Sequence, residues 1–336
     1  MPPTIHLALT HDWELRGDGS GDIEEIQFAP LRRLLRIYQQ TGVRTTFLPD
    51  VMQQLRFRSL QSEHAELKSL ADSWDDHARE AFGHGHDIQL HLHPQWLNGE
   101  YENGRWRLPG KWSIVKYDQQ TARSMLEKSK YYLEQLLRPL NQSYRCVAFR
   151  AGALAAAPSD HLFETLASLD MQLDVSIAPG LVANEHNLGL DYRNCQETFL
   201  PFYPHMKDAR KISDKPEPVV CVPLHHFYGS RRAVTRQNLA LARRRMFEGP
   251  NGSIKDAGEN KERGSRLSLA YQKLIKPALS RKYFVSDTGR LNYSLMQEML
   301  ASIRQRARSS GLENVPVVLT NHPKDIRDWN GLERFV

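Results

Sequence analysis

Two histidines occur where a protein could hold a divalent metal. His91 and His93 alternate with the apolar residues of Ile88–Leu92. This period of two predicts a strand with its apolar residues on one face and both imidazoles on the other. Pro94 follows directly and ends the strand, because proline has no backbone N–H. Paired imidazoles at the end of a strand are typical divalent-metal ligands, and the alternative is a pair of solvated or core histidines without a ligand.

Carboxylates appear at the end of another expected strand. The apolar-rich segment Ile5–Thr10 leads into Asp12 and Glu14, which lie two residues apart and point the same way in an extended chain. Sites in α/β folds lie at the carboxyl ends of their strands. The alternative is that both are loop acids that cap the following helix.

Three more polar residues share this placement. Strands are expected at 144–149, 173–177 and 315–320, and Arg150, Asp174 and His322 lie at or near their ends. Taken alone, Arg150 is equally consistent with an ordinary surface arginine. In a barrel of parallel strands, however, the carboxyl ends converge on one face. The convergence predicts a catalytic metal centre.

The order of the elements predicts the fold class. Helical spacing at 28–40 and 59–82 alternates with strands at 5–10, 43–48 and 88–93, a β-α-β-α-β order typical of parallel strands with crossover helices. Further helices are expected at 119–137 and 293–307, a further strand at 219–224, and irregular loops at 180–218. The segment 97–117 has turn signals around Trp106 and Trp112, whose rings would either line a sugar cleft or cover the core.

Composition narrows the class of protein. The chain has 336 residues, 40% of them hydrophobic and 25% charged, which suits one large α/β domain or two domains. Neither a signal peptide nor an apolar run long enough to span a membrane is apparent. The three cysteines form no disulfide or metal-binding pattern, so a cytoplasmic protein is expected.

The net charge of +6 is concentrated in one segment. Residues 231–290 contain 15 Lys or Arg against 5 Asp or Glu, which indicates a basic helical insertion within a single domain of residues 1–336. One interpretation is a solvated helical face. The other is contact with phosphate, an anionic glycan or a membrane surface. Nucleic acid is not an expected partner, because no recognised binding module is present.

Four short motifs also resemble a known family. THDWE (10–14), GHDIQLH (85–91), FRAG (149–152) and LTNHP (319–323) occur in the order found in the NodB-homology polysaccharide deacetylases, carbohydrate esterase family 4. The resemblance implies an α/β fold, a distorted (β/α) barrel of seven or eight mostly parallel strands, with one divalent metal. Zinc is expected, with cobalt, nickel or manganese as alternatives.

The resemblance also implies roles for individual residues. Asp12 would be the general base, oriented by Arg150, and His322 the general acid. Glu14 and His91 would be metal ligands.

The chain departs from the family pattern at two ligands. The family has an aspartate ligand, often directly after the base, where this chain has Trp13 and then Glu14. The family's second histidine lies four residues after the first, a place taken here by Gln95. Either His93 replaces that histidine or Gln95 holds a water. The family's fourth motif is not clearly present, and Asp174 is the candidate for it.

The expected activity is metal-dependent N-deacetylation of an amino sugar or polysaccharide with release of acetate, in the synthesis of a surface polysaccharide. The substrate would be an N-acetylated saccharide, a nucleotide sugar or a lipid-linked glycan. Trp13, Trp96 and the backbone amide near Gly152 are the expected substrate contacts. The alternatives are a hydrolase of another C–N bond on the same fold and a glycan-binding protein without activity.

Overall fold

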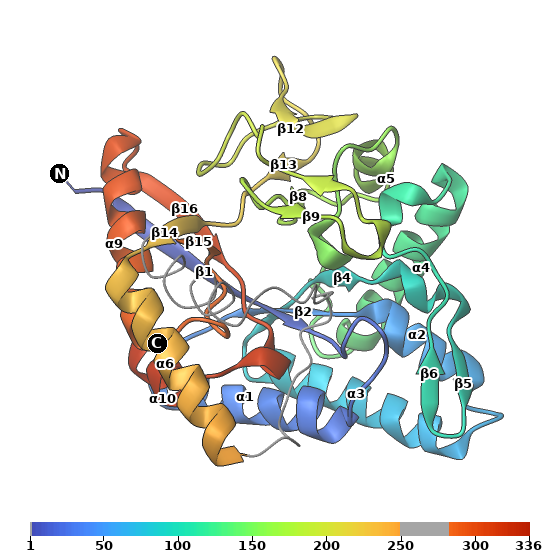
Figure 1. The fold of residues 1–336 in the computed structure, drawn as a ribbon. Helices are drawn as coiled ribbons and strands as arrows, with labels where there is room; N and C mark the ends of the chain where they lie inside the picture. The colour runs from blue at the N-terminus through green and yellow to red at the C-terminus, as the bar shows by residue number, and fades with distance from the viewer. Residues whose placement is uncertain (1, 249–281) are drawn as a thin grey trace, which may run out of the picture.

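Two sheets of parallel strands form the centre of the molecule (Figure 1). The computed structural model describes residues 2–248 and 282–336. Side chains are described for residues 2–239 and 282–336. The first sheet has the order β16-β1-β2-β3, and the second has the order β13-β8-β7-β4. Every neighbouring pair in them is parallel. The strands are β1 (Thr4–Trp13), β2 (Thr46–Pro49), β3 (Asp87–Ile88), β4 (Leu90–Leu92), β7 (Ala148–Ala151), β8 (Leu173–Asp174), β13 (Val220–Cys221) and β16 (Asn314–Leu319).

Isolated parallel bridges connect the two sheets at both sides. Asp50, just after β2, pairs with His91 of β4. Leu224, beyond the end of β13, pairs with Val318 of β16. The predicted α/β class with parallel strands is therefore confirmed.

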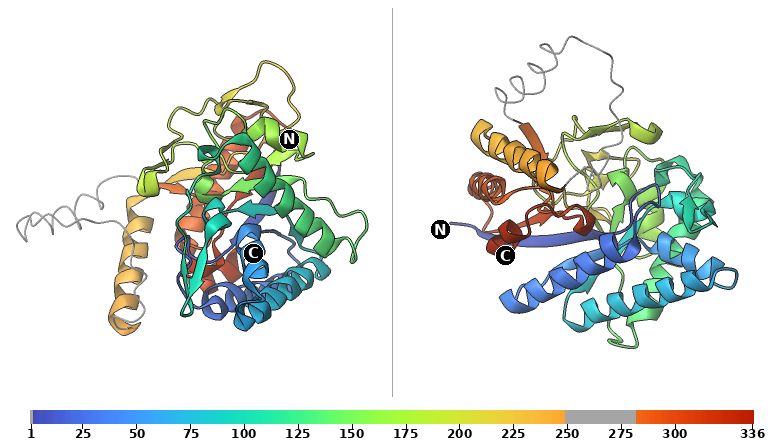
Figure 2. Two further views of the ribbon diagram at one scale, coloured as in Figure 1. Left: turned by 90° about the vertical axis from the view of Figure 1, so that its right-hand side faces the viewer. Right: turned by 60° about the horizontal axis from the view of Figure 1, so that its bottom comes forward.

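Helices flank these sheets. Figure 1 shows α1, α2 and α3 along β1 and β2, and α4 and α5 beside the second sheet. Helix α6 packs beside α9, as Figure 2 also shows. The apolar face of α9 buries Leu295, Met299 and Ile303 in a cluster with residues of β16. The helices are α1 (Ala29–Thr41), α2 (Val51–Leu60), α3 (Ala65–Gly83), α4 (Gln119–Leu137), α5 (Leu162–Ser168), α6 (Arg231–Glu248), α9 (Tyr293–Ser309) and α10 (Trp329–Phe335).

Helices with one apolar face match the sequence predictions best. The predicted helix at 119–137 is confirmed as α4, and the one at 293–307 is confirmed as α9. The helix predicted over 59–82 corresponds to α3, which begins later, at Ala65, and the preceding helix α2 at 51–60 was not predicted. Helix α2 buries residues around much of its circumference, including both apolar and amide side chains. It therefore lacks the periodic apolar stripe that sequence reasoning recognises.

The predicted histidine strand is divided into β3 and β4 at Gln89. The Gln89 side chain is buried, and its Oε1 accepts hydrogen bonds from the backbone N–H groups of Val147 and Ala148, at 2.8 Å each. A side chain thus replaces a strand partner at this position. The alternation is preserved beyond the break, so both histidines still reach the same site.

Short hairpins occupy the segments without strong periodicity. Strands β5 (Glu100–Glu102) and β6 (Arg105–Arg107) form a hairpin across Asn103 and Gly104, whose φ angles are 51° and 74°. Positive φ at both central residues is the requirement of a tight two-residue turn. The prediction of only irregular loops over 180–218 was wrong. That segment contains β9 (Val182–Ala183), β10 (Leu190–Asp191), β11 (Pro204–His205) and β12 (Asp208–Ile212).

The basic segment 231–290 is described in part. It begins as α6, which follows β14 (His226–Gly229), and includes β15 (Lys282–Val285), which pairs with β14. Residues 249–281 lie outside the described residues. None of the helices described is both long and apolar enough to cross a membrane.

Candidate metal and catalytic site

Six of the predicted site residues meet at one edge of the two sheets, and His93, which follows β4, is one of them. Asp12 lies near the end of β1, and Glu14 follows that strand. His91 belongs to β4 and Arg150 to β7, and these two residues are register partners in the second sheet. His322 comes shortly after β16. The sequence argument from strand ends therefore leads to a real cluster.

Glu14, His91 and His93 form a buried group suited to a metal ion. One ligand atom from each of the three lies within 4.8 Å of the others. His91 Nε2 is 3.1 Å from Glu14 Oε2, and His93 Nε2 contacts the same oxygen. No member of the group is more than 6% exposed. One carboxylate oxygen and two imidazole nitrogens are a donor set that zinc and similar divalent ions prefer.

The surroundings of His91 fit a metal ligand. Its Nδ1 is 3.0 Å from the backbone carbonyl of Arg150, which can only accept, so Nδ1 carries the proton. Nε2 is then the nitrogen directed at Glu14. Burial alone would lower the pKa of His91, but the carboxylates of Asp12 and Glu14 outweigh burial and raise this pKa to about 9. A divalent cation can take the place of the proton that this negative environment favours.

Arg150 holds Asp12 in its ionised form. The guanidinium has no exposed surface and donates to Asp12 Oδ1, to Thr10 Oγ1 at 2.8 Å and to the backbone carbonyl of Val175 at 3.0 Å. Burial would raise the pKa of Asp12, yet the neighbouring Arg150 cation keeps this pKa below its usual value. Asp12 is therefore a buried carboxylate able to accept a proton.

His322 has the opposite protonation preference. Its Nδ1 lies 2.8 Å from Asp287 Oδ2, and its Nε2 lies 3.4 Å from Asp12 Oδ2. Burial would lower the pKa of His322, but Asp287 and Asp12 outweigh it and raise this pKa. Its side chain is 20% exposed, against 3% for Asp12. His322 is thus a proton donor on the more open side of the cluster.

Three charged residues at the site were missed by sequence reasoning. Asp50 Oδ1 accepts a hydrogen bond from the backbone N–H of His93 at 3.1 Å, and Lys324 Nζ donates to Glu14 Oε1 at 2.7 Å. The third is Asp287, the partner of His322. Asp50 directly follows β2, so the rule of strand ends could have found it. Asp287 lies near the end of the basic segment 231–290, and no sequence spacing indicates it.

Asp174 is the fully buried last residue of β8, the strand next to β7, which carries Arg150. Its Oδ1 accepts from Ser176 Oγ at 2.6 Å, and its Oδ2 from Cys221 Sγ at 3.6 Å. Ser176 Oγ in turn accepts from the backbone N–H of Ala151 in β7. Burial raises the pKa of Asp174 to about 6. Asp174 therefore supports the strand that carries Arg150, a position different from the catalytic one expected for it.

The expected substrate contacts have packing roles in this structure. Trp13 and Trp96 are each 1% exposed. Trp13 stacks on Trp74, with ring centroids 5.1 Å apart, so it presents no free face to a sugar. A Cβ atom at Gly152 would lie 2.8 Å from His93 Nδ1, so only glycine lets the chain just after β7 lie against this imidazole.

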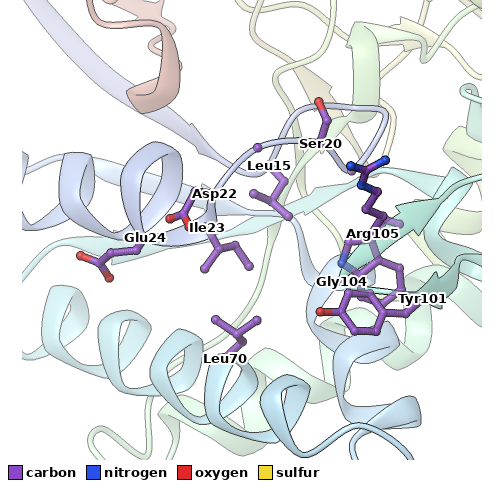
Figure 3. A pocket seen from close by; sticks show the side chains of 12 residues that line it. Leu15, Ser20, Asp22, Ile23, Glu24, Leu70, Tyr101, Gly104 and Arg105 are labelled. Carbon is purple, nitrogen blue, oxygen red and sulfur yellow. The ribbon is translucent and has the colours of Figure 1, made fainter. Parts of the chain in front are cut away.

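A separate pocket lies next to the segment that follows Glu14 (Figure 3). It measures about 570 Å³. Leu15, Ile23 and Leu70 form its apolar part, and the β5–β6 hairpin contributes Tyr101 and Arg105. Leu15 and residues 19–24 line this pocket, and this segment follows Glu14 of the candidate metal cluster along the chain.

Comparison with known proteins gives structural neighbours only. No family model and no curated protein matches the chain. The structure is similar to that of a protein from Mycobacterium smegmatis assigned to the polysaccharide deacetylases, with 16% identity, a TM-score of 0.47, and coverage of 100% of this chain and 83% of that one. It is also similar to one from Pseudomonas aeruginosa PAO1 with the same assignment, with 11% identity, a TM-score of 0.44, and coverage of 98% and 83%.

The PuuE allantoinase is a third structural neighbour. It shares 10% identity with this chain, at a TM-score of 0.45, and the match covers 98% of this chain and 82% of that one. At these identities, and with all three TM-scores below 0.5, the function depends on the chemistry of the site.

Proposed function

We propose that the protein is a metal-dependent N-deacetylase that releases acetate from an N-acetylated saccharide. The observation that carries the proposal is the pairing of opposite proton preferences beside one candidate metal cluster. Arg150 lowers the pKa of Asp12 and so favours its ionised form, while Asp287 raises the pKa of His322 and so favours its protonated form. Hydrolysis of an amide needs both a base and an acid, next to a group that polarises the carbonyl.

A divalent ion held by Glu14, His91 and His93 would supply a Lewis acid. Asp12 takes a proton from the water that attacks the acetyl carbon, while Arg150 keeps the Asp12 carboxylate in place. His322 then gives its proton to the amine nitrogen as the C–N bond breaks. The products are acetate and a free amino sugar, and Asp287 stabilises the charged imidazole before that transfer.

Several finer features belong to the same proposal. The metal is zinc, with cobalt, nickel or manganese as alternatives. The two sheets act as one distorted barrel within a single domain. The substrate is a nucleotide sugar or a lipid-linked glycan used in the synthesis of a surface polysaccharide in the cytoplasm. The basic segment 231–290 would favour such phosphate-bearing substrates, or contact with a membrane surface.

A second candidate is a metal-dependent hydrolase of another C–N bond. The observation that favours it is the burial of Trp13 and Trp96, so that neither of the two tryptophans expected to contact a sugar is exposed. The acid, the base and the candidate metal ligands would serve either substrate equally well.

Metal content and acetate release test the proposal together. Purified protein should hold about one equivalent of a divalent metal, and the His91→Ala variant should hold none. Wild type should release acetate from N-acetylglucosamine oligomers, lose this activity with a chelator, and regain it with zinc. Metal binding without acetate release, together with turnover of another amide, would favour the second candidate. A wild type that takes up no metal would contradict both.

A further inference from the structure

In the two candidate histidine ligands, different groups determine which ring nitrogen carries the proton. A backbone carbonyl faces Nδ1 of His91 and can only accept. Nδ1 of His93 instead faces the side-chain amide of Gln95, with Gln95 Nε2 at 3.0 Å. An amide can present either a donor or an acceptor, so the proton of His93 depends on which way the Gln95 amide is turned.

In this structure the amide presents its donor. Gln95 Nε2 bonds both to His93 Nδ1 and to the backbone carbonyl of Gly17, which lies 3.1 Å away. Because Nδ1 accepts, the proton of neutral His93 is on Nε2, the nitrogen that contacts Glu14. A protonated nitrogen has no lone pair for a metal. With the amide turned this way, His93 Nε2 therefore has no lone pair to offer a metal.

Gln95 also has an unused acceptor. The side chain has no exposed surface, and within the described part of the chain its Oε1 has no hydrogen-bond partner. A half turn of the amide would direct Oε1 at His93 Nδ1–H and free Nε2 for a metal. The same turn would remove the donor from the Gly17 carbonyl and place an oxygen near it, which is unfavourable.

We propose that Gln95 is a positioning residue that decides whether His93 can bind the metal, and that metal loading turns its amide and releases Gly17. This inference rests on the proposed function, because it requires a metal at Glu14, His91 and His93. It also accounts for Gln95 at the position of the family's second histidine. His93 is the ligand, and Gln95 acts on it through Nδ1, the ring nitrogen opposite the one that binds the metal.

The released segment is the loop between β1 and the first helical turn. Gly17 packs against the ring of Trp112, and the loop residues Gly19 and Gly21 have φ angles of 76° and 106°. Residues 19–24 line the pocket of Figure 3. Metal loading should therefore change backbone protection in 16–22, at a distance from the ligands themselves.

Two variants of Gln95 separate the parts of the inference. Gln95→Leu has neither donor nor acceptor, so zinc affinity should fall 10- to 100-fold, the usual loss when a ligand's hydrogen-bond partner is removed. Gln95→Glu can only accept, so it should keep zinc affinity while leaving Gly17 without a donor. Gln54→Leu is the control, because Gln54 is also a buried glutamine with an unpartnered Oε1 but bonds to Ala71, Asp75 and Tyr132.

The measurements are zinc affinity by chelator competition, amide hydrogen exchange of 16–22, and the ring-nitrogen NMR signals of His93. In wild type, zinc should move the His93 proton from Nε2 to Nδ1 and speed exchange in 16–22. Gln95→Glu should show fast exchange in 16–22 already without zinc. Gln54→Leu should behave as wild type.

Three results would overturn the inference. The first is a metal-free wild type in which the His93 proton is on Nδ1. The second is amide hydrogen exchange in 16–22 that is the same with and without zinc. A folded Gln95→Leu could also bind zinc as tightly as wild type, in which case the proposed deacetylase would still stand. If wild type binds no zinc at all, the proposed function and this inference both fail.

Discussion

Replacing Asp287 with asparagine should shift the pH range in which the proposed deacetylase works. Asp287 Oδ2 is 2.8 Å from His322 Nδ1, and the Asp287 side chain is 8% exposed. Asparagine can keep the hydrogen bond through its carbonyl oxygen but has no charge. The substitution therefore tests the electrostatic part of the interaction with little change in shape.

The size of the effect follows from this geometry. A hydrogen bond to a charged group at a buried site is worth about 1.5–3 kcal/mol, and one pKa unit corresponds to about 1.4 kcal/mol. Burial opposes the charged imidazole, and Asp287 is the chief group that outweighs it. The pKa of His322 should therefore fall by about one to two units.

The assay is the pH dependence of kcat/KM for acetate release. The active form has His322 protonated, so the rate declines as pH rises through the pKa of His322. Because Asp287 raises that pKa, its loss should move the alkaline limb to lower pH by about one to two units. At pH values above the wild-type pKa of His322, kcat/KM should be about 10- to 100-fold below wild type.

Asp325→Asn provides a matched control. Asp325 bonds to Arg290, which also pairs with Asp287, but the Asp325 side chain does not bond to the His322 ring in the described structure. Its removal should leave the alkaline limb near its wild-type position. If both variants show the wild-type limb, His322 is not the acid whose proton state Asp287 controls, and the reasoning fails.

Three further predictions concern Arg150, Gly152 and Gln89. Arg150→Met should raise the pKa of Asp12, because that cation no longer opposes the effect of burial, and the acid limb of kcat/KM should then move to higher pH. Urea titration should show a free energy of unfolding about 3–5 kcal/mol lower than that of wild type. An unmoved acid limb would argue against Asp12 as the base. Gly152→Ala should weaken zinc binding in chelator competition, because its Cβ would lie 2.8 Å from His93 Nδ1, and unchanged affinity would contradict His93 as a ligand. Gln89→Ala should lower the free energy of unfolding by about 1–3 kcal/mol, because two half-buried backbone N–H groups lose their acceptor, with unchanged stability as the contrary result.

The sequence was most informative where chemistry followed a local pattern. Asp12 and Glu14, and likewise His91 and His93, lie two residues apart, and a strand directs such pairs to one side whatever surrounds it. The apolar stripes of α4 and α9 likewise depend only on helical spacing. Local periodicity and the parallel order of the strands were therefore enough to predict which elements deliver most of the candidate site.

Tertiary structure decided which groups complete that site. Lys324 reaches Glu14 across 310 positions of sequence, and Asp287 reaches His322 only because β16 and the end of the basic segment lie side by side. The sequence predicts a substrate contact for Trp13, but this ring is buried and stacks on Trp74. Such contacts depend on how distant segments pack, and the proton preferences of the buried site depend on those contacts in turn. The sequence of a single segment therefore indicates neither these contacts nor these proton preferences.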